Sequence, residues 1–239
     1  MLDRTLRVQF LCRDGERARA GQRLLALDGR AAAILAGERV ALNFLQRMSG
    51  IATLTARFVA RVGPGGPSIL DTRKTAPGLR ILDKYAVACG GGVNHRMGLY
   101  DQILIKDNHR ALWSAARRGS LAQAVAEARR RYPGRVVEVE VESLDELRDV
   151  IREGPDWILL DNMPCAQIRR CVREAAGRCR LEASGGITLR NIRRVAATGV
   201  DAISLGCLTH SVSATDISLE VVLDEQTRAA GVEVDDAAS

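Results

Sequence analysis

Short apolar runs alternate with amphipathic stretches along the chain from about residue 67 onward. The apolar runs cover residues 68–71, 102–106, 136–141, 157–161, 180–184 and 201–206. The stretches between them carry helix signals: Pro77 before a stop near Gly90, Ser143 with Glu146 as a capping box, Pro164, and Thr188 before Gly199. This repeated strand-then-helix pattern predicts parallel strands joined by crossover helices.

The residues that follow each run favour a barrel over an open sheet. Every run ends on polar or glycine residues, such as Asp71, Lys106, Asp161 and Gly206. In a barrel these ends meet at one mouth, whereas an open sheet concentrates function at a single switch point. Because the chain has room for only about six or seven such strands, we predict an incomplete, TIM-like α/β barrel.

The first 66 residues follow another pattern. Residues 8–28 resemble strand and turn material, and residues 29–63 form a long helical region that we expect to be interrupted near Ser49 and Gly50. A glycine and proline cluster at residues 63–67 marks a boundary. We therefore expect a smaller N-terminal domain at 1–66, the barrel at 67–214, and at 215–239 a tail with a helix that packs back toward the N-terminal domain.

The positive charge of the chain indicates an anionic partner of small size. The net charge is +6 and the pI is near 9.3, but aromatic residues make up only 3% and the arginines are spread along the chain. This distribution fits a basic pocket or a solvated basic surface better than a nucleic-acid interface. The three lysines, Lys74, Lys84 and Lys106, all lie within one short window, which marks them as positions that need a compact ammonium group.

Compartment signals are few. No apolar stretch has the length of a membrane span, and the N-terminus lacks the apolar core of a signal peptide, so we expect a cytoplasmic protein without membrane contact. The six cysteines form no Cys-x-x-Cys pair, and we interpret them as reduced thiols.

Two cationic loops are candidate anion sites. Arg73 and Lys74 lie between a strand and a helix start, and His95 and Arg96 follow three glycines, so the four could surround a dicarboxylate or a phosphate. Lys106, at a strand end, could bind phosphate or pyrophosphate, form a Schiff base, or only pair with Glu140 or Asp161.

Carboxylates and glycines at other strand ends complete the candidate chemistry. Glu138, Glu140 and Glu142 share one strand face, with Glu140 nearest the mouth and Glu138 paired deeper in the barrel. Glu140 and Asp161 would be neighbours that bind Mg²⁺ or sugar hydroxyls. Two glycine-containing strand ends suggest a phosphate grip, made by Ser184, Gly185 and Gly186 with Leu205, Gly206 and Cys207. The histidines lack the spacing of a zinc site.

These motifs, in this order, resemble the quinolinate phosphoribosyltransferase family from about residue 20 to 220. The resemblance implies an N-terminal α/β sandwich, an incomplete α/β barrel completed by a partner subunit in a homodimer, and transfer of a phosphoribosyl group to quinolinate with Mg²⁺ as cofactor. Family members usually carry a further N-terminal segment, so we expect this N-terminal domain to be truncated and activity to suffer.

The resemblance also implies residue roles. Arg73, Lys74, His95 and Arg96 would hold the carboxylates of quinolinate, with Thr72 in the same loop and Arg39 reaching the pocket from the partner. Lys106, Glu140 and Asp161 would act in catalysis, the lysine on phosphoribosyl pyrophosphate and the carboxylates on its ribose and Mg²⁺. Residues 184–186 and 205–207 would hold its 5′-phosphate.

Three other interpretations stay open at this point. One is the related phosphoribosyltransferase-like protein of molybdate transport, against which Asn94, His95 and Arg96 argue. The second is a barrel aldolase that uses Lys106 as a Schiff base. The third is a non-catalytic protein that binds anions or RNA.

Overall fold

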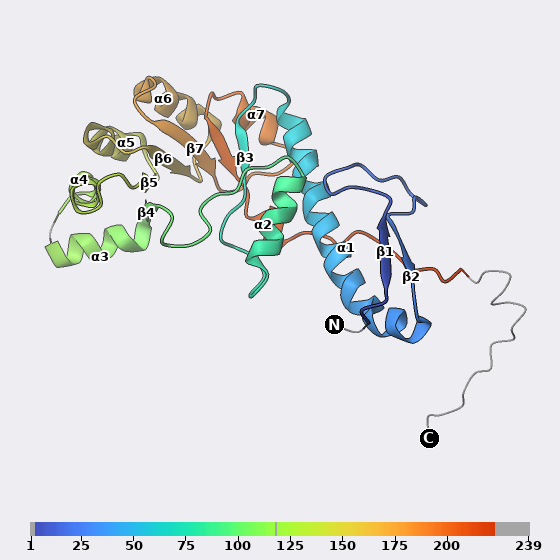
Figure 1. Ribbon diagram of the computed structural model, residues 1–239. Coiled ribbons are helices and arrows are strands. Elements are labelled where there is room, and N and C mark those ends of the chain that lie inside the picture. The colour runs from blue at the N-terminus through green and yellow to red at the C-terminus, as the bar shows by residue number, and fades with distance from the viewer. Residues whose placement is uncertain (1–2, 118, 223–239) are drawn as a thin grey trace, which may run out of the picture.

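The computed structural model describes residues 3–117 and 119–222 and is built around a parallel six-stranded sheet (Figure 1). Its strands are β3 (Ser68–Leu70), β4 (Ile103–Ile105), β5 (Val137–Val141), β6 (Trp157–Asp161), β7 (Arg180–Ser184) and β8 (Ala202–Ser204). Their order is β3-β8-β7-β6-β5-β4, with every neighbouring pair parallel. Each of the six predicted apolar runs forms a strand, and the expected α/β class is confirmed.

The two outer strands, β3 and β4, are linked by a segment that starts as an extension of the sheet. Val93 forms a parallel bridge with Leu70, and its N–H donates to the Ile69 carbonyl at 2.8 Å. The chain then crosses from the edge of β3 to the start of β4. This crossing segment, residues 93–102, carries His95 to the face of the sheet on which Glu138 and Glu182 lie.

Helices cover the sheet between the strands. They are α2 (Arg80–Cys89), α3 (Asp107–Arg117), α4 (Leu121–Arg131), α5 (Leu144–Val150) with a 3₁₀ turn (Ile151–Glu153), α6 (Cys165–Ala175), α7 (Ile192–Ala196) and α8 (Cys207–His210). The Ser143 side chain accepts the Glu146 N–H at the start of α5, which is one half of the predicted capping box, while the Glu146 side chain accepts the Glu142 N–H instead. Val139 and Val141 of β5 are fully buried, so the valine face of this strand packs in the core. Because side chains alternate along a strand, Glu138 and Glu140 lie on the opposite face.

The N-terminal part consists of an antiparallel hairpin and the first half of one long helix. The hairpin pairs β1 (Arg7–Phe10) with β2 (Leu25–Asp28), and α1 (Ala31–Val62) follows as a single helix of 32 residues. The interruption expected near Ser49 and Gly50 is therefore wrong. Gly50 serves a close crossing instead, because a Cβ there would lie 2.2 Å from the Ser213 carbonyl oxygen.

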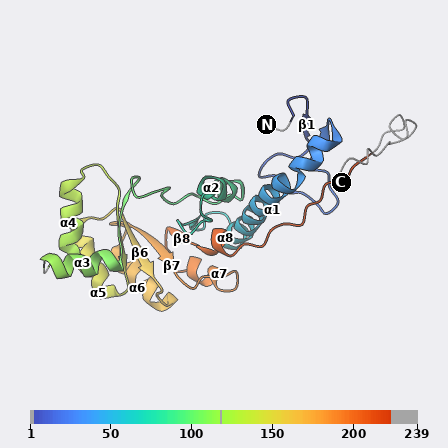
Figure 2. The same ribbon diagram turned by 90° about the horizontal axis from the view of Figure 1, so that it is seen from below.

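The helix α1 connects the two parts of the molecule. Ile51 and Phe58 in its second half belong to the main core, while its first half carries the hairpin and projects beyond the sheet (Figure 1). Figure 2 shows the segment after α8 running alongside α1, where Gln46 binds the backbone of both Thr215 (3.0 Å) and Ile217 (2.8 Å).

The predicted C-terminal helix is absent from residues 215–222, and the rest of that range lies outside the described residues. Among the described helices, none combines the length and apolarity needed to cross a bilayer.

Candidate functional site

The carboxyl ends of the six strands bring the predicted site residues to one end of the sheet. Asp161 lies opposite Ser184 in the β6–β7 ladder, and Lys106 follows Ile105, which lies opposite Val139. The loops after β3, β7 and β8 supply the remainder: Thr72, Arg73, Lys74, Gly185, Gly186, Leu205, Gly206 and Cys207. Arg39 is the exception, since it is exposed on the projecting half of α1.

Lys106 and Glu140 form an ion pair at this mouth. Nζ lies 2.6 Å from Glu140 Oε2, and the lysine side chain is 43% exposed whereas the glutamate is 9% exposed. The sequence left open whether Lys106 pairs with Glu140 or Asp161, and the structure shows the pair with Glu140. It leaves the ammonium accessible to an anion that arrives from solvent.

A buried network fixes the loop that carries Arg73 and Lys74. Asp83 of α2 is fully buried and accepts two hydrogen bonds from Arg47 of α1, at 2.9 and 2.8 Å, and one from the Ala76 N–H at 3.0 Å. Arg47 also donates to the Thr209 carbonyl, and Thr209 Oγ1 donates to the Lys74 carbonyl at 2.7 Å. Helices α1, α2 and α8 therefore hold this loop in one conformation.

Lys84 anchors the second cationic loop from inside the core. Its Nζ lies 2.5 Å from Asp71 Oδ1 and donates to the His95 carbonyl at 2.9 Å, with both charged side chains 1% exposed or less. The His95 N–H donates to the same Asp71 oxygen at 2.7 Å. Burial raises the pKa of Asp71, while Lys84 opposes that shift. The ammonium group of Lys84 therefore has a structural role, since it neutralises Asp71 and holds the backbone at His95.

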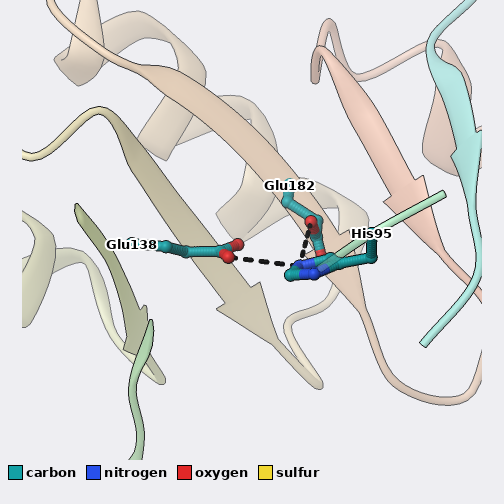
Figure 3. Close-up of side chains that lie close together, drawn as sticks. All are labelled: His95, Glu138 and Glu182. Carbon is teal, nitrogen blue, oxygen red and sulfur yellow. Dashed lines mark ion pairs between the residues drawn. The ribbon is translucent and has the colours of Figure 1, made fainter. Parts of the chain in front are cut away.

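His95 lies between two buried glutamates that enter from different strands (Figure 3). Nε2 is 3.1 Å from Glu138 Oε2 of β5 and 3.5 Å from Glu182 Oε2 of β7, and each carboxylate is about 1% exposed. On the other side of the ring, the Arg96 N–H donates to Nδ1 at 2.7 Å. Both ring nitrogens are therefore engaged within the protein.

The proton balance of this cluster follows from these contacts. Burial lowers the pKa of His95, but the hydrogen bonds and charges of Glu138 and Glu182 outweigh it and raise the pKa to about 9. Burial also raises the pKa of Glu138. Because Nδ1 accepts the Arg96 N–H, the ring proton that faces the two carboxylates lies on Nε2.

The same three side chains have the spacing of a metal site, with one donor atom from each within 4.8 Å of the others. A metal at Nε2 would require a lone pair there. Since Nδ1 accepts a hydrogen bond from Arg96, the ring proton of the neutral imidazole lies on Nε2. The cluster is therefore better described as a hydrogen-bonded group than as a metal centre.

Arg96 and Arg73 place two guanidinium groups close together. Arg96 is 8% exposed and donates from Nη1 to the Gln102 carbonyl at 3.2 Å. Burial lowers the pKa of Arg96, and the nearby charge of Arg73 lowers it further. A buried arginine with a second, exposed arginine near enough to lower its pKa favours a ligand with two negative charges.

The ends of β6 and β7 form a tight backbone turn. Asn162 has a φ of 52° and donates from Nδ2 to Asp161 Oδ2 at 2.8 Å. Gly185 has a φ of 89°, and a Cβ there would lie 2.1 Å from the side-chain oxygen of Asn162. Only glycine fits at this position, because the Asn162 side chain fills the space beside it.

Sequence reasoning missed several residues that hold the site. Glu182, Gln102, Arg47 and Asp83 are the main ones. Glu182 had a readable signal, because it interrupts the apolar run of β7, but its partner His95 is far away in sequence. A separate cavity of about 690 Å³ lies at the amino ends of the strands, lined in part by Asp156, Trp157 and Arg180, away from this mouth.

The fold and the site together define an α/β protein that gathers cationic and acidic side chains at the carboxyl ends of a parallel sheet, an arrangement that suits small polyanions. The C-terminal domain model of quinolinate phosphoribosyl transferase matches residues 51–220 and the N-terminal domain model matches residues 1–49. The chain belongs to the quinolinate phosphoribosyltransferase family.

Individual relatives agree with this assignment. A Bacillus subtilis protein named as a probable carboxylating nicotinate-nucleotide pyrophosphorylase is 45% identical over 95% of this chain and 77% of its own length. A Mycobacterium leprae protein named as a carboxylating nicotinate-nucleotide pyrophosphorylase is 46% identical over 90% of this chain and 75% of its own. The crystal structure of NadC from Streptococcus pyogenes superposes with a TM-score of 0.86 at 43% identity, covering 92% of this chain and 76% of that one.

Proposed function

We propose that this chain transfers the phosphoribosyl group of phosphoribosyl pyrophosphate to quinolinate, with loss of carbon dioxide, to give nicotinate mononucleotide and pyrophosphate. The observation that carries the proposal is the convergence of two cationic loops with Lys106, Glu140 and Asp161 at the strand ends of a chain from this family. The enzyme is accordingly a glycosyltransferase of the pentosyl class.

The cationic loops would bind the dianionic pyridine acid. Arg73 lies close enough for its charge to lower the pKa of Arg96, and Lys74 rests against Gly206, its Cδ 3.1 Å from the position of a Cβ there. An arginine can grip a carboxylate with two parallel hydrogen bonds, so the pair suits two neighbouring carboxylates on one ring.

The opposite side of the mouth would bind the sugar phosphate. The loops at residues 184–186 and 205–207 would bind the 5′-phosphate through backbone N–H groups, and Lys106 would contact the pyrophosphate or ribose. Glu140 and Asp161 offer carboxylate oxygens that suit Mg²⁺, which prefers oxygen ligands and usually shares them with phosphate groups. Bound there, the ion would offset charge that builds up on the leaving pyrophosphate.

The reaction requires positioning and charge stabilisation from the protein. The bond between ribose C1 and the pyrophosphate oxygen breaks, and its electrons leave with pyrophosphate while C1 gains oxocarbenium character. The pyridine nitrogen then forms a bond to C1. In the ribosylated ring the bond from C2 to its carboxylate breaks, carbon dioxide leaves, and C2 takes up a proton. Glu140 and Asp161 would stabilise the cationic sugar, and the arginines would hold the ring in line.

We also propose a homodimer in which Arg39 of one subunit completes the pocket of the other. The projecting half of α1 supports this, because Leu35, Val40 and Phe44 expose 56%, 61% and 40% of their surfaces, and Val40 and Phe44 lie one turn apart. Exposed apolar side chains on a helix that leaves its own domain suit a second copy of the chain.

The direct test incubates the purified chain with quinolinate, phosphoribosyl pyrophosphate and Mg²⁺ and detects nicotinate mononucleotide and pyrophosphate in equal amounts. Omission of each component in turn is the control. Product formation with nicotinate in place of quinolinate, and none with quinolinate, would contradict the proposed substrate. Activity that is unchanged when a chelator replaces Mg²⁺ would contradict the metal assignment.

A further inference from the structure

Arg96 is held at both its ends by one closed circuit of hydrogen bonds. Its backbone N–H donates to His95 Nδ1, and His95 Nε2 faces Glu138 Oε2 at 3.1 Å. The same glutamate oxygen accepts from Gln102 Nε2 at 2.7 Å, and the Gln102 carbonyl accepts from Arg96 Nη1 at 3.2 Å. Both the backbone and the guanidinium of Arg96 are thus tied to one carboxylate of β5.

Stability alone gives a poor account of the carboxylates in this circuit. Glu138 and Glu182 are each 1% exposed, and Oε1 of each has no hydrogen-bond partner among the described residues. Buried carboxyl oxygens without partners cost free energy, and apolar residues of similar size at such positions are often neutral or stabilising. Two such groups around one imidazole therefore point to a role in the site.

We infer that Glu138 and Glu182 are positioning residues that fix His95 as its Nε2–H tautomer, so that the imidazole and Gln102 together hold Arg96 in place for an anionic substrate. The Nδ1 lone pair can accept the Arg96 N–H only if the ring proton is on Nε2. Glu138 supplies the nearer acceptor for that proton, and Glu182 supports it from the neighbouring side. This inference rests on the proposed function for the identity of the substrate.

Two variants of Glu138 separate the effects of charge, shape and hydrogen bonding at this position. Glu138→Gln keeps an oxygen that accepts from both His95 and Gln102. Glu138→Leu fills the same space without an acceptor. We expect Glu138→Leu to raise the KM for quinolinate about tenfold, as the loss of one such contact would, with a far smaller effect on the KM for phosphoribosyl pyrophosphate. Glu138→Gln should stay close to the parent protein in both.

Stability measurements exclude a purely structural effect. The melting temperature of Glu138→Gln should match that of the parent, because it keeps the oxygen that accepts from Gln102 and faces His95. Glu138→Leu should stay folded at the assay temperature, because the lost acceptor is offset by removal of a carboxyl oxygen without a partner. Glu142→Ala is the matched control, since Glu142 directly follows β5, is 55% exposed and lies outside the circuit. Gln102→Ala gives a milder second variant that removes one donor to Glu138 and should also raise only the KM for quinolinate.

The tautomer itself is measured by ¹⁵N NMR of histidine-labelled protein, which is practical because the chain has three histidines. His95→Asn identifies the His95 signals by difference. The parent should show a protonated Nε2 and an unprotonated Nδ1, and Glu138→Leu should lose this preference. An Nδ1–H tautomer in the parent, or an unchanged KM for quinolinate in both Glu138→Leu and Gln102→Ala, would overturn the inference. If the parent does not convert quinolinate, the proposed function fails, while the tautomer measurement still decides the role of the glutamates.

Discussion

Lys106 and Glu140 join the ends of β4 and β5 across 2.6 Å, with the ammonium exposed and the carboxylate nearly buried. A substrate phosphate that enters the mouth would meet a cation already oriented by a fixed partner, which costs little reorganisation at the moment of reaction. Substitution of Lys106 is therefore the most direct test of the catalytic role proposed for Lys106, Glu140 and Asp161.

Lys106→Ala should lower kcat/KM about 100-fold or more while leaving the fold intact, because the side chain is partly exposed and contributes charge rather than packing. Product formation and circular dichroism are measured on the same sample. Arg110→Ala is the control, since Arg110 lies on α3, the helix that directly follows Lys106, and its cation pairs with Glu146 of α5. Equal losses in both variants would argue against a specific role for Lys106.

Lys84→Met should destabilise the protein by about 3–5 kcal/mol, because Asp71 would be left as a buried charge without its partner. Urea denaturation gives the free energy of unfolding. Adding Asp71→Asn to the same chain should recover part of the loss. Arg130→Ala, which removes an exposed ion pair with Glu127, should cost less than about 1 kcal/mol. A similar small change in Lys84→Met would contradict the buried pair.

The sequence predicts the strands and their functional ends well, because both depend on local information. A short apolar run followed by a polar or glycine residue is typical of a parallel strand in a barrel, and every such run forms one. The pairing of Lys106 with Glu140 was also within reach, since adjacent βα units place consecutive strand ends side by side.

The connections between distant segments could not be predicted in the same way. His95 contacts Glu182 across 87 positions of sequence, and no periodicity records such a contact. Gly50 illustrates the opposite error, since a glycine inside a helix pattern suggests a break, whereas here it makes room for Ser213. Lys84 was singled out by its rarity, but its burial and its partner Asp71 depend on how α2 packs against β3.

Gly50→Ala should loosen the segment after α8 from α1. Alanine favours the helix by about 1 kcal/mol, but its Cβ would overlap the Ser213 carbonyl oxygen, so the segment must shift. Hydrogen exchange at Thr215, whose N–H donates to the Gln46 carbonyl, reports the shift. Ala60→Gly on the same helix is the control and should leave that exchange unchanged. Increased stability with full protection at Thr215 would contradict the close crossing.

The stability of the protein should decline as the pH rises from about 6.5 toward 9. The folded His95 cluster has a pKa raised to about 9 from the ordinary 6.5 of histidine, so the folded state binds a proton that the unfolded state has lost. Its stabilising contribution is complete below pH 6.5 and disappears as the pH passes 9. Melting temperatures across this range measure the effect, and His95→Asn should flatten the curve. An equally steep decline in both proteins would assign it to other groups.

Subunits that carry different defects should restore activity when mixed, if Arg39 acts across a dimer interface. Arg39→Ala keeps Lys106 and the other residues at the strand ends, and Lys106→Ala keeps a normal Arg39 for its partner. After unfolding and refolding together in equal amounts, half of the dimers are mixed and each contains one intact site, so about a quarter of the parent activity should return. Each variant refolded alone should stay inactive. The absence of recovery, with mixed dimers demonstrated by mass, would place Arg39 outside the partner's pocket.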